Sequence, residues 1–169
     1  VNASVSLSRS SVSNVTASAG GSKITYSDAL GSGVDIEYQT GWNGLKETIV
    51  LSEKPAKEGA LVIHGTLYYN TSTLSVFVDG ENVTGRARTT GAVEFRNSTN
   101  ATVMHIPKGW AHDSSVSTAP GDPGRTHAVA SPRWQNVTYE LERHGDVTYL
   151  DLIVPADYLH SEKTTYPVM

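Results

Sequence analysis

The sequence of 169 residues contains no cysteine. Disulfide frameworks and zinc sites built on cysteine thiolates are therefore excluded. A chain of this length forms one domain by default, with a core large enough to fold without covalent cross-links.

Neither a basic surface nor a membrane-spanning segment is indicated by the composition. The formal net charge is −4, so the basic footprint of nucleic-acid-binding proteins is missing. No apolar run reaches the length of a transmembrane helix, and the N-terminus lacks the charged-then-apolar pattern of a signal peptide. We therefore predict no nucleic-acid partner and no membrane span, and we interpret Val1 as the start of a mature or trimmed chain.

Metal-binding patterns are also missing. The six histidines show neither H-x-H nor H-x-x-x-H spacing, so no zinc site is predicted. Asp113 and the turn at 121–124 could supply oxygens to calcium, but their spacing matches no EF-hand loop and a Pro/Gly turn is the favoured interpretation. We predict no metal and no cofactor other than covalent N-glycans.

Candidate catalytic groups are few. Asp35 and Glu37 would lie on one face of a strand, about 7 Å apart, a spacing compatible with glycoside hydrolysis. A solvated strand face explains the same alternation and is favoured. His112, Asp113 and Ser114 are adjacent in sequence, which prevents the relay geometry of a catalytic triad. We predict that the chain is not an enzyme, with a secreted glycoside hydrolase kept as an alternative.

N-glycosylation motifs, by contrast, are abundant. All asparagines except Asn43 begin an N-x-[ST] triplet, and the segment NSTNAT at 97–102 holds two triplets in succession. Random placement of the 37 Ser and Thr residues after eight Asn residues would give about two triplets, against seven present. We predict an exported glycoprotein whose acceptor sites are Asn2, Asn14, Asn70, Asn82, Asn97, Asn100 and Asn136.

Apolar residues alternate with polar ones at the period of a β-strand in five segments: 33–38, 61–69, 73–80, 136–142 and 147–154. Asp79-Gly80 fits a two-residue hairpin turn. Residues 155–160 fit one helical turn after Pro155. The pattern predicts an all-β fold, an antiparallel sandwich that is Ig-like or jelly-roll-like, with an extended N-terminal strand.

Two segments depart from this pattern. Residues 1–21 form a predicted strand and tether, the tether being the Ser/Ala/Gly-rich stretch 17–22, ahead of a sandwich domain at 22–169. Within that domain, residues 108–133 are predicted to be a long surface loop that serves subunit contacts. The N-terminal strand is predicted to pair with its own sheet or to complete that of a neighbouring subunit through Val1, Ala3, Val5, Leu7 and Val15.

The segment 24–55 resembles a β-rich domain of large extracellular proteins in bacteria and archaea, including RHS/YD-repeat and wall-associated proteins. The resemblance follows the pattern Y-x-D, V-D-I-x-Y and G-L-K-E-x-I-V-L, carried here by Tyr26, Asp28, Val34, Asp35, Ile36, Tyr38, Gly44, Leu45, Lys46, Glu47, Ile49, Val50 and Leu51. Residues 105–115 and the closing segment 154–168, which ends in Y-P-V, are similar in outline, with Tyr158 where Trp is common. Members of the family usually continue past Y-P-V, whereas this sequence stops at Met169, so we expect a free-standing module. The resemblance implies an extracellular β-domain and no catalytic residues.

Three classes of function remain open. The favoured one is a structural subunit of an extracellular glycosylated filament or surface layer, a homo-polymer assembled head-to-tail by N-terminal strand addition. The second is a carbohydrate-binding or adhesive module, since Trp42, Trp110 and Trp134 could form a sugar platform, although burial in the core is the favoured role for these indoles. The third is the hydrolase named above. Dense N-glycosylation without cysteine favours an archaeal source.

Overall fold

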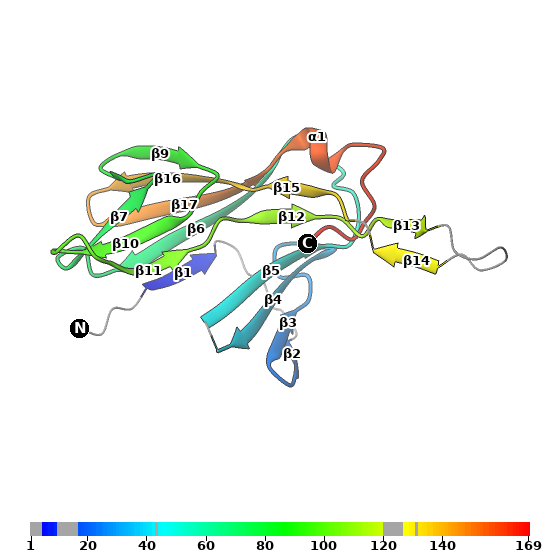
Figure 1. Cartoon of the computed structure of the whole chain (residues 1–169), viewed down its shortest axis with the longest axis horizontal. Helices are drawn as coiled ribbons and strands as arrows, with labels where there is room; N and C mark the ends of the chain where they lie inside the picture. Colours follow the sequence, from blue (N-terminus) through cyan, green and yellow to red (C-terminus); the bar gives the residue numbers. More distant parts are fainter. Residues whose placement is uncertain (1–4, 10–16, 43, 120–126, 131) are drawn as a thin grey trace. The chain divides into compact units, whose positions relative to one another are not determined.

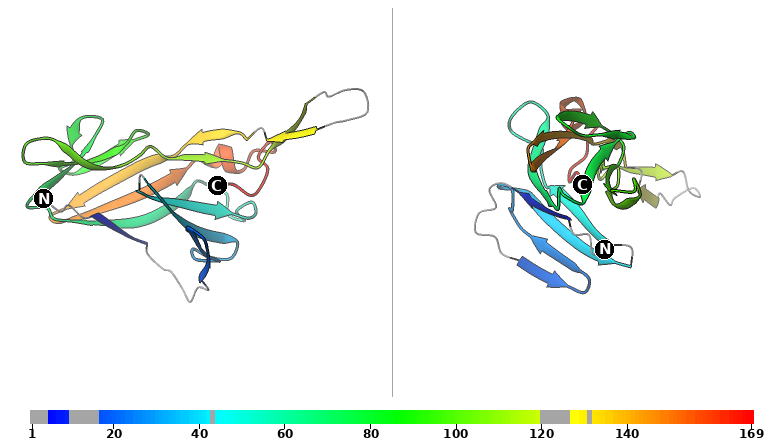
Figure 2. Two further views of the ribbon diagram at one scale, coloured as in Figure 1. Left: turned by 60° about the horizontal axis from the view of Figure 1, so that its bottom comes forward. Right: turned by 90° about the vertical axis from the view of Figure 1, so that its left-hand side faces the viewer.

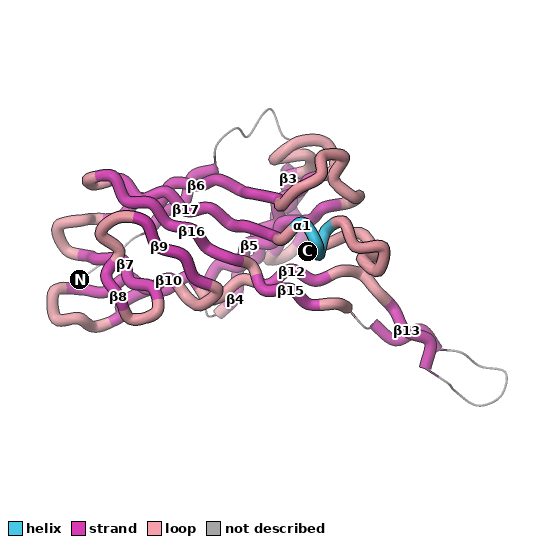
Figure 3. Tube along the Cα trace, turned by 90° about the horizontal axis from the view of Figure 1, so that it is seen from above, coloured by secondary structure: helices cyan, strands magenta, loops and turns pink. Residues whose placement is uncertain are grey.

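The computed structural model describes residues 5–9, 17–42, 44–119, 127–130 and 132–169. Strands dominate this part of the chain, and its single helix, α1 (Ala156–Leu159), is one turn long (Figure 3). The strands pair antiparallel in several sheets, which confirms the predicted all-β, sandwich-like class. In the described residues no helix has the length and apolar character needed to cross a membrane.

The chain divides into two compact units. Unit 1 comprises residues 1–10, 59–110 and 136–156, and unit 2 comprises residues 11–58, 111–135 and 157–169. The division interleaves segments of the sequence and cuts across the predicted regions 1–21 and 22–169.

Unit 1 contains two antiparallel sheets. The larger has the strand order β1 (Val5–Arg9), β6 (Leu61–Tyr69), β17 (Val147–Val154), β16 (Thr138–His144) and β9 (Arg86–Thr89). The smaller has the order β11 (Thr102–Ile106), β10 (Val93–Asn97), β7 (Leu74–Val78) and β8 (Glu81–Asn82). β6, β16 and β17 run side by side in the ribbon of Figure 1. Strands β6 and β17 have the bounds that the periodicity predicts.

Both sheets of unit 1 bury alternate residues in one apolar core. Leu67 and Leu150 of the larger sheet are at most 1% exposed, and Val76 and Phe95 of the smaller sheet are equally buried. The rings of Tyr69 and Phe95 meet edge to face with centroids 5.5 Å apart, which joins the two sheets. Period-two burial on both sheets defines a sandwich.

The tight turn predicted at Asp79-Gly80 connects β7 to β8. Val78 pairs with Glu81, and the intervening residues have positive φ angles of 50° and 87°. Positive φ at both central positions is the conformation that a two-residue hairpin needs, and Asp-Gly tolerates it.

Unit 2 contains a four-stranded sheet with the order β2 (Ala17–Gly20), β3 (Lys23–Tyr26), β4 (Val34–Gly41) and β5 (Gly44–Leu51), drawn blue to cyan in Figure 2. The C-terminal segment adds to its core: Leu51 and Val168 exchange backbone hydrogen bonds of 2.8 and 3.0 Å, and His112 and Met169 exchange bonds of 2.7 and 2.8 Å. Val168 is 2% exposed.

Two segments expected to lack strands contain them. Ala17–Gly20, placed in the predicted tether, is strand β2 and pairs with β3 along its length. The positive φ of Gly21, 61°, closes this hairpin, so cross-strand pairing overrides the small-residue composition.

The predicted loop 108–133 contains β12 (Trp110–His112) and a hairpin of β13 (Val116–Ala119) with β14 (His127–Ala130). Most of its prolines and glycines fall at 120–124 in the sequence, between the two hairpin strands. β12 pairs with β15 (Trp134–Asn136), and the chain passes between the units within these two strands. The expectation that residues 108–133 form a loop is thus wrong for these strands.

We expect Phe95→Ala to lower the free energy of unfolding by about 3–5 kcal/mol, because it leaves a large cavity in the core of unit 1. Urea denaturation followed by circular dichroism measures the loss. The exposed ring of Tyr149 gives the control: Tyr149→Ala should cost less than about 1 kcal/mol. Equal losses in the two variants would contradict the assignment of Phe95 to the core.

Candidate functional site

The described candidate glycan acceptors all belong to unit 1: Asn70, Asn82, Asn97, Asn100 and Asn136. Asn97 is half-buried and the other four are exposed. Asn2 and Asn14 lie outside the described residues.

The doubled motif NSTNAT forms the hairpin turn between β10 and β11. The Asn97 amide and carbonyl close the turn: its N–H donates to the Ala101 carbonyl at 3.0 Å and its carbonyl accepts from Asn100 N–H at 2.9 Å. Its side-chain Oδ1 accepts three further bonds, from Ala101 N at 3.0 Å, Thr99 N at 3.0 Å and Thr99 Oγ1 at 2.8 Å. Asn97 is therefore the residue that organises this turn.

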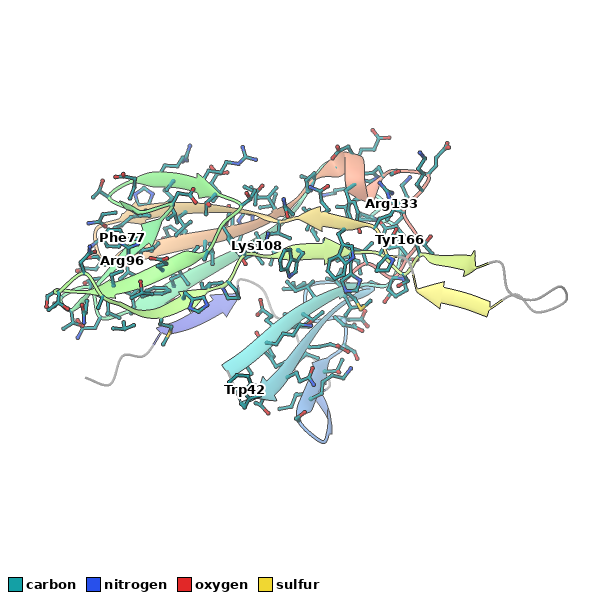
Figure 4. All side chains as sticks on the ribbon, viewed as in Figure 1. Trp42, Phe77, Arg96, Lys108, Arg133 and Tyr166 are labelled. Atoms are coloured by element: carbon teal, nitrogen blue, oxygen red, sulfur yellow. The ribbon has the colours of Figure 1, made fainter. Side chains whose placement is uncertain are left out.

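Asn100 has a different structural role in the same turn. Its φ of 62° is in the left-handed region, which asparagine tolerates better than most residues with a side chain. A turn followed by one left-handed residue is a common hairpin connection that shifts the strand register. Such a shift occurs here between Phe95 and Arg96. The Arg96 guanidinium lies 4.4 Å from the centre of the Phe77 ring and donates to Asn100 Oδ1 at 3.4 Å (Figure 4).

Asn70 organises a second turn at the same end of unit 1. Its Oδ1 accepts from Ser72 N at 3.0 Å, and its carbonyl accepts from Leu74 N at 2.9 Å. Leu74 in turn pairs with Asn97 across β7 and β10. The turn between β16 and β17 lies at the same end, because Thr71 Oγ1 donates to the carboxylate of Asp146 in that turn at 2.9 Å. Three candidate acceptors are thus gathered at one end of the sandwich.

Turn chemistry supplies a second reason for asparagine at 70, 97 and 100. Asn70 and Asn97 mimic a turn by accepting from the backbone N–H two residues on, and the Thr99 hydroxyl assists at Asn97. At Asn100 the left-handed φ is the reason. The same two-residue spacing reads as a glycosylation triplet. Only Oδ1 is used in the bonds described, whereas a glycan is attached to Nδ2, so the two roles are chemically compatible.

The remaining described acceptors lie on strands. Asn82 is on the two-residue strand β8, opposite Phe77, and Asn136 ends β15. Both are exposed, while the middle residues of their triplets, Val83 and Val137, are 3% and 6% exposed.

We expect the mass of the secreted protein to exceed that of the bare chain, and Asn97→Asp to remove one glycan without loss of stability. Aspartate keeps the oxygen that the turn uses but cannot accept an N-linked sugar. Asn97→Ala removes both and should lower the free energy of unfolding by about 1–2 kcal/mol. Intact-mass measurement before and after deglycosylation, with thermal unfolding, separates the two roles. An unchanged mass on deglycosylation would contradict the glycoprotein prediction.

The predicted N-terminal strand is present as β1, at the edge of the larger sheet of unit 1. Val5 pairs with Tyr69 and Leu7 with Leu67 in an antiparallel register that ends with Arg9 opposite Gly65. Leu67 is 1% exposed. The alternation of the sequence therefore places its apolar residues opposite core-facing positions of β6. Val1, Ala3 and Val15 lie outside the described residues.

Asp113 is the most notable ionisable group of unit 2, with only 1% of its surface exposed. Its Oδ1 accepts from Arg133 N at 2.7 Å and Ser115 N at 3.2 Å, and its Oδ2 accepts from Ser115 Oγ at 2.8 Å and Thr165 N at 3.3 Å. These bonds tie β12 to the chain before β15 and to the C-terminal segment. From the sequence, Asp113 is a candidate calcium ligand and triad member, and its role as a hydrogen-bond acceptor that links these segments is not predicted.

The hydrogen bonds decide the protonation of Asp113. Burial of the carboxyl group raises its pKa, but the bonds from Arg133, Ser115 and Thr165 together outweigh burial and hold the pKa below its usual value. Beside it, burial raises the pKa of Tyr158 to about 12, and the Tyr158 hydroxyl donates to the Arg133 carbonyl at 2.8 Å. Asp113 is thus a charged structural anchor.

We expect Asp113→Ala to lower the free energy of unfolding by about 2–4 kcal/mol at pH 7, because buried N–H groups lose their acceptor. The folded-state pKa of Asp113 is depressed, so its contribution is complete above the unfolded pKa of about 3.9 and is lost as pH falls through the folded value. Urea titrations from pH 7 to pH 2 should show the gap between wild type and variant closing only in acid. A constant gap would contradict the charged-anchor role.

The other candidate catalytic groups have separate partners. Asp35 Oδ1 accepts from Asp28 N at 2.8 Å, and Glu37 forms an ion pair with Lys23 at 2.8 Å. Ser114 Oγ donates to the Pro167 carbonyl at 2.7 Å, and His112 Nδ1 lies 3.3 Å from the Asp113 carbonyl oxygen. The described part of the chain holds no group of three or more His, Asp or Glu side chains suited to a metal ion.

The expectation that the tryptophans are buried in the core is wrong. Trp42 is 99% exposed, Trp134 61% and Trp110 52%. Trp42 lies in the β4–β5 turn (Figure 4), where a hairpin tip offers no core. Trp134 packs against the His112 ring with centroids 4.6 Å apart, and the Lys108 ammonium lies 4.3 Å from the centre of the Trp110 ring. Aliphatic residues fill the cores instead, together with the rings of Phe95, Tyr139 and Tyr158.

No protein-family model, no curated protein and no solved structure matches the chain significantly. The likeness to extracellular RHS/YD-repeat domains therefore stays a prediction from the motifs at 24–55.

Proposed function

We propose that the chain is a structural subunit of an extracellular, glycosylated filament or surface layer, which assembles when β1 of one copy completes the larger sheet of the next. The observation that carries the proposal is the place of β1. Among the described strands it is an edge strand that pairs with β6 alone, and residues 10–16 separate it from β2 in the sequence.

The edge position makes β1 exchangeable. A strand in the middle of a sheet has hydrogen-bonded neighbours on both sides, but β1 releases a single ladder, with five residue pairs, when it leaves. A β1 strand from another copy can restore the same register on β6, because the two chains are identical. Since strand and groove lie on different surfaces, such an interface is head-to-tail and propagates unless its rotation closes a ring.

The acceptor asparagines agree with an extracellular polymer. Exposed sites on β8, on β15 and in the turns of unit 1 are open to a glycosyltransferase. Glycans would also shield the edge strands β8 and β11 from stray pairing between filaments.

Cysteine cross-linking tests the proposal directly, because the chain has no cysteine of its own. Ser6 pairs with Tyr68, so Ser6→Cys with Tyr68→Cys places two thiols across the β1–β6 ladder. We expect a ladder of covalent multimers on a non-reducing gel, which collapses to monomer on reduction. The out-of-register pair Ser8→Cys with Tyr68→Cys is the control and should link poorly. A disulfide formed only within monomers would contradict strand exchange.

A carbohydrate-binding module is the second candidate, and the exposure of Trp42, Trp110 and Trp134 favours it. Exposed indole faces can stack on the apolar faces of sugars. Glycan-array binding that is lost on Trp→Ala at one of these positions, in a protein that stays monomeric, would support this candidate over the polymer.

A further inference from the structure

One end of the sheet in unit 2 exposes apolar side chains. Ile24, Trp42 and Leu45 are 40%, 99% and 65% exposed, whereas Ile36 and Leu51 of the same sheet are 3% and 5% exposed. Ile24 pairs with Tyr38, and Leu45 with Thr40 two residues further along β4, so both share one face of the sheet. Trp42 lies in the β4–β5 turn, beyond Thr40 at the same end of the sheet. We name Ile24, Trp42 and Leu45 the apolar end.

We propose that the apolar end contacts a second copy of the chain when β1 is exchanged, an inference that rests on the proposed function. The tether supplies the first reason. Arg9 and Ala17 are eight residues apart in sequence, which bounds their separation to about 28 Å even when fully extended. Wherever β1 is donated, the β2–β5 sheet of the donor follows it to the surface of the acceptor.

The distribution of glycosylation triplets is the second reason. The described acceptors are in unit 1, and the sequence from 17 to 69 contains none. Asn43, the one asparagine without a triplet, directly follows Trp42 in the sequence. A glycan there would cover the surface, so its absence suits a face that another protein covers.

The thermodynamics of exchange is the third reason. Strand exchange makes the same β1–β6 contacts within one chain and between chains, so it provides no net attraction between copies. A polymer needs contacts that the monomer lacks. Trp is among the residues that dominate such contacts, and exposed Ile24 and Leu45 add apolar area that a partner can bury. Beside them, β5 leaves its outer edge without a neighbouring strand in the described sheet.

The test uses the Ser6→Cys, Tyr68→Cys protein as parent and adds Trp42→Ala with Leu45→Ala. We expect the protein concentration needed for half-maximal multimer ladder to rise about tenfold or more, the effect of losing an interface hot spot. Thermal unfolding of the monomer should not change, because both side chains are exposed. Trp134→Ala, at another exposed indole, is the matched control and should leave the ladder unchanged.

A second variant covers the surface with a sugar. Leu45→Thr turns Asn43-Gly44-Leu45 into a glycosylation triplet and also removes the Leu45 side chain. A glycan at Asn43 should abolish the ladder, and deglycosylation should restore it to the level of Leu45→Ala, the matched control. A ladder that persists in the Ala and Thr variants overturns the inference and leaves the proposed function standing. If those variants also lose binding to glycans, the apolar end is a sugar site.

A parent protein that forms no ladder overturns both the inference and the proposed function. An equal loss of the ladder in Trp134→Ala overturns the assignment of the contact to the apolar end.

Discussion

The apolar core shared by the two sheets of unit 1 is the constraint on which the rest of that unit depends. Once Leu67, Leu150 and Phe95 are buried at period two, the register of every strand is fixed, because a slip by one residue would turn the buried row to solvent. The same constraint specifies where a strand can be added. Beyond β6 the described sheet ends in β1, which pairs with β6 over five residues.

Turns carry the second layer of organisation, and they link fold to modification. Asn97 and Asn70 hold their hairpins through Oδ1, a role that Asn or Asp can fill, so turn geometry favours these residues whether or not a sugar is attached. An asparagine required by a turn is also presented at the surface, where a glycosyltransferase acts. Turn geometry therefore favours residues that also begin triplets, and the number of triplets alone overstates the support for the predicted glycosylation.

The sequence predicts most of the sandwich because its signals are local. Alternation predicts β6 and β17 to the residue, Asp79-Gly80 predicts its turn, and Pro155 precedes the helical turn α1. Strand β2 and the β13–β14 hairpin were missed because pairing with a partner strand, not local composition, makes them. The role of Asp113 was missed because its partners Arg133 and Thr165 come from distant parts of the chain. The tryptophans were misplaced because an indole suits a buried site and a contact surface equally well.

The proposed exchange of β1 and the proposed contact at the apolar end would contribute in different ways to the free energy of polymer formation. A strand on a short tether sees its own groove at an effective concentration of about 1 mM, so pairing within the chain prevails at micromolar protein unless extra contacts favour the polymer. A thousandfold bias corresponds to about 4 kcal/mol. Burying the side chains of Ile24, Trp42 and Leu45 yields at most about 1.5–3 kcal/mol each, and less for Ile24, which is only 40% exposed, before the cost of immobilising them. The proposed contact at the apolar end would therefore supply free energy of the size that the proposed exchange of β1 requires.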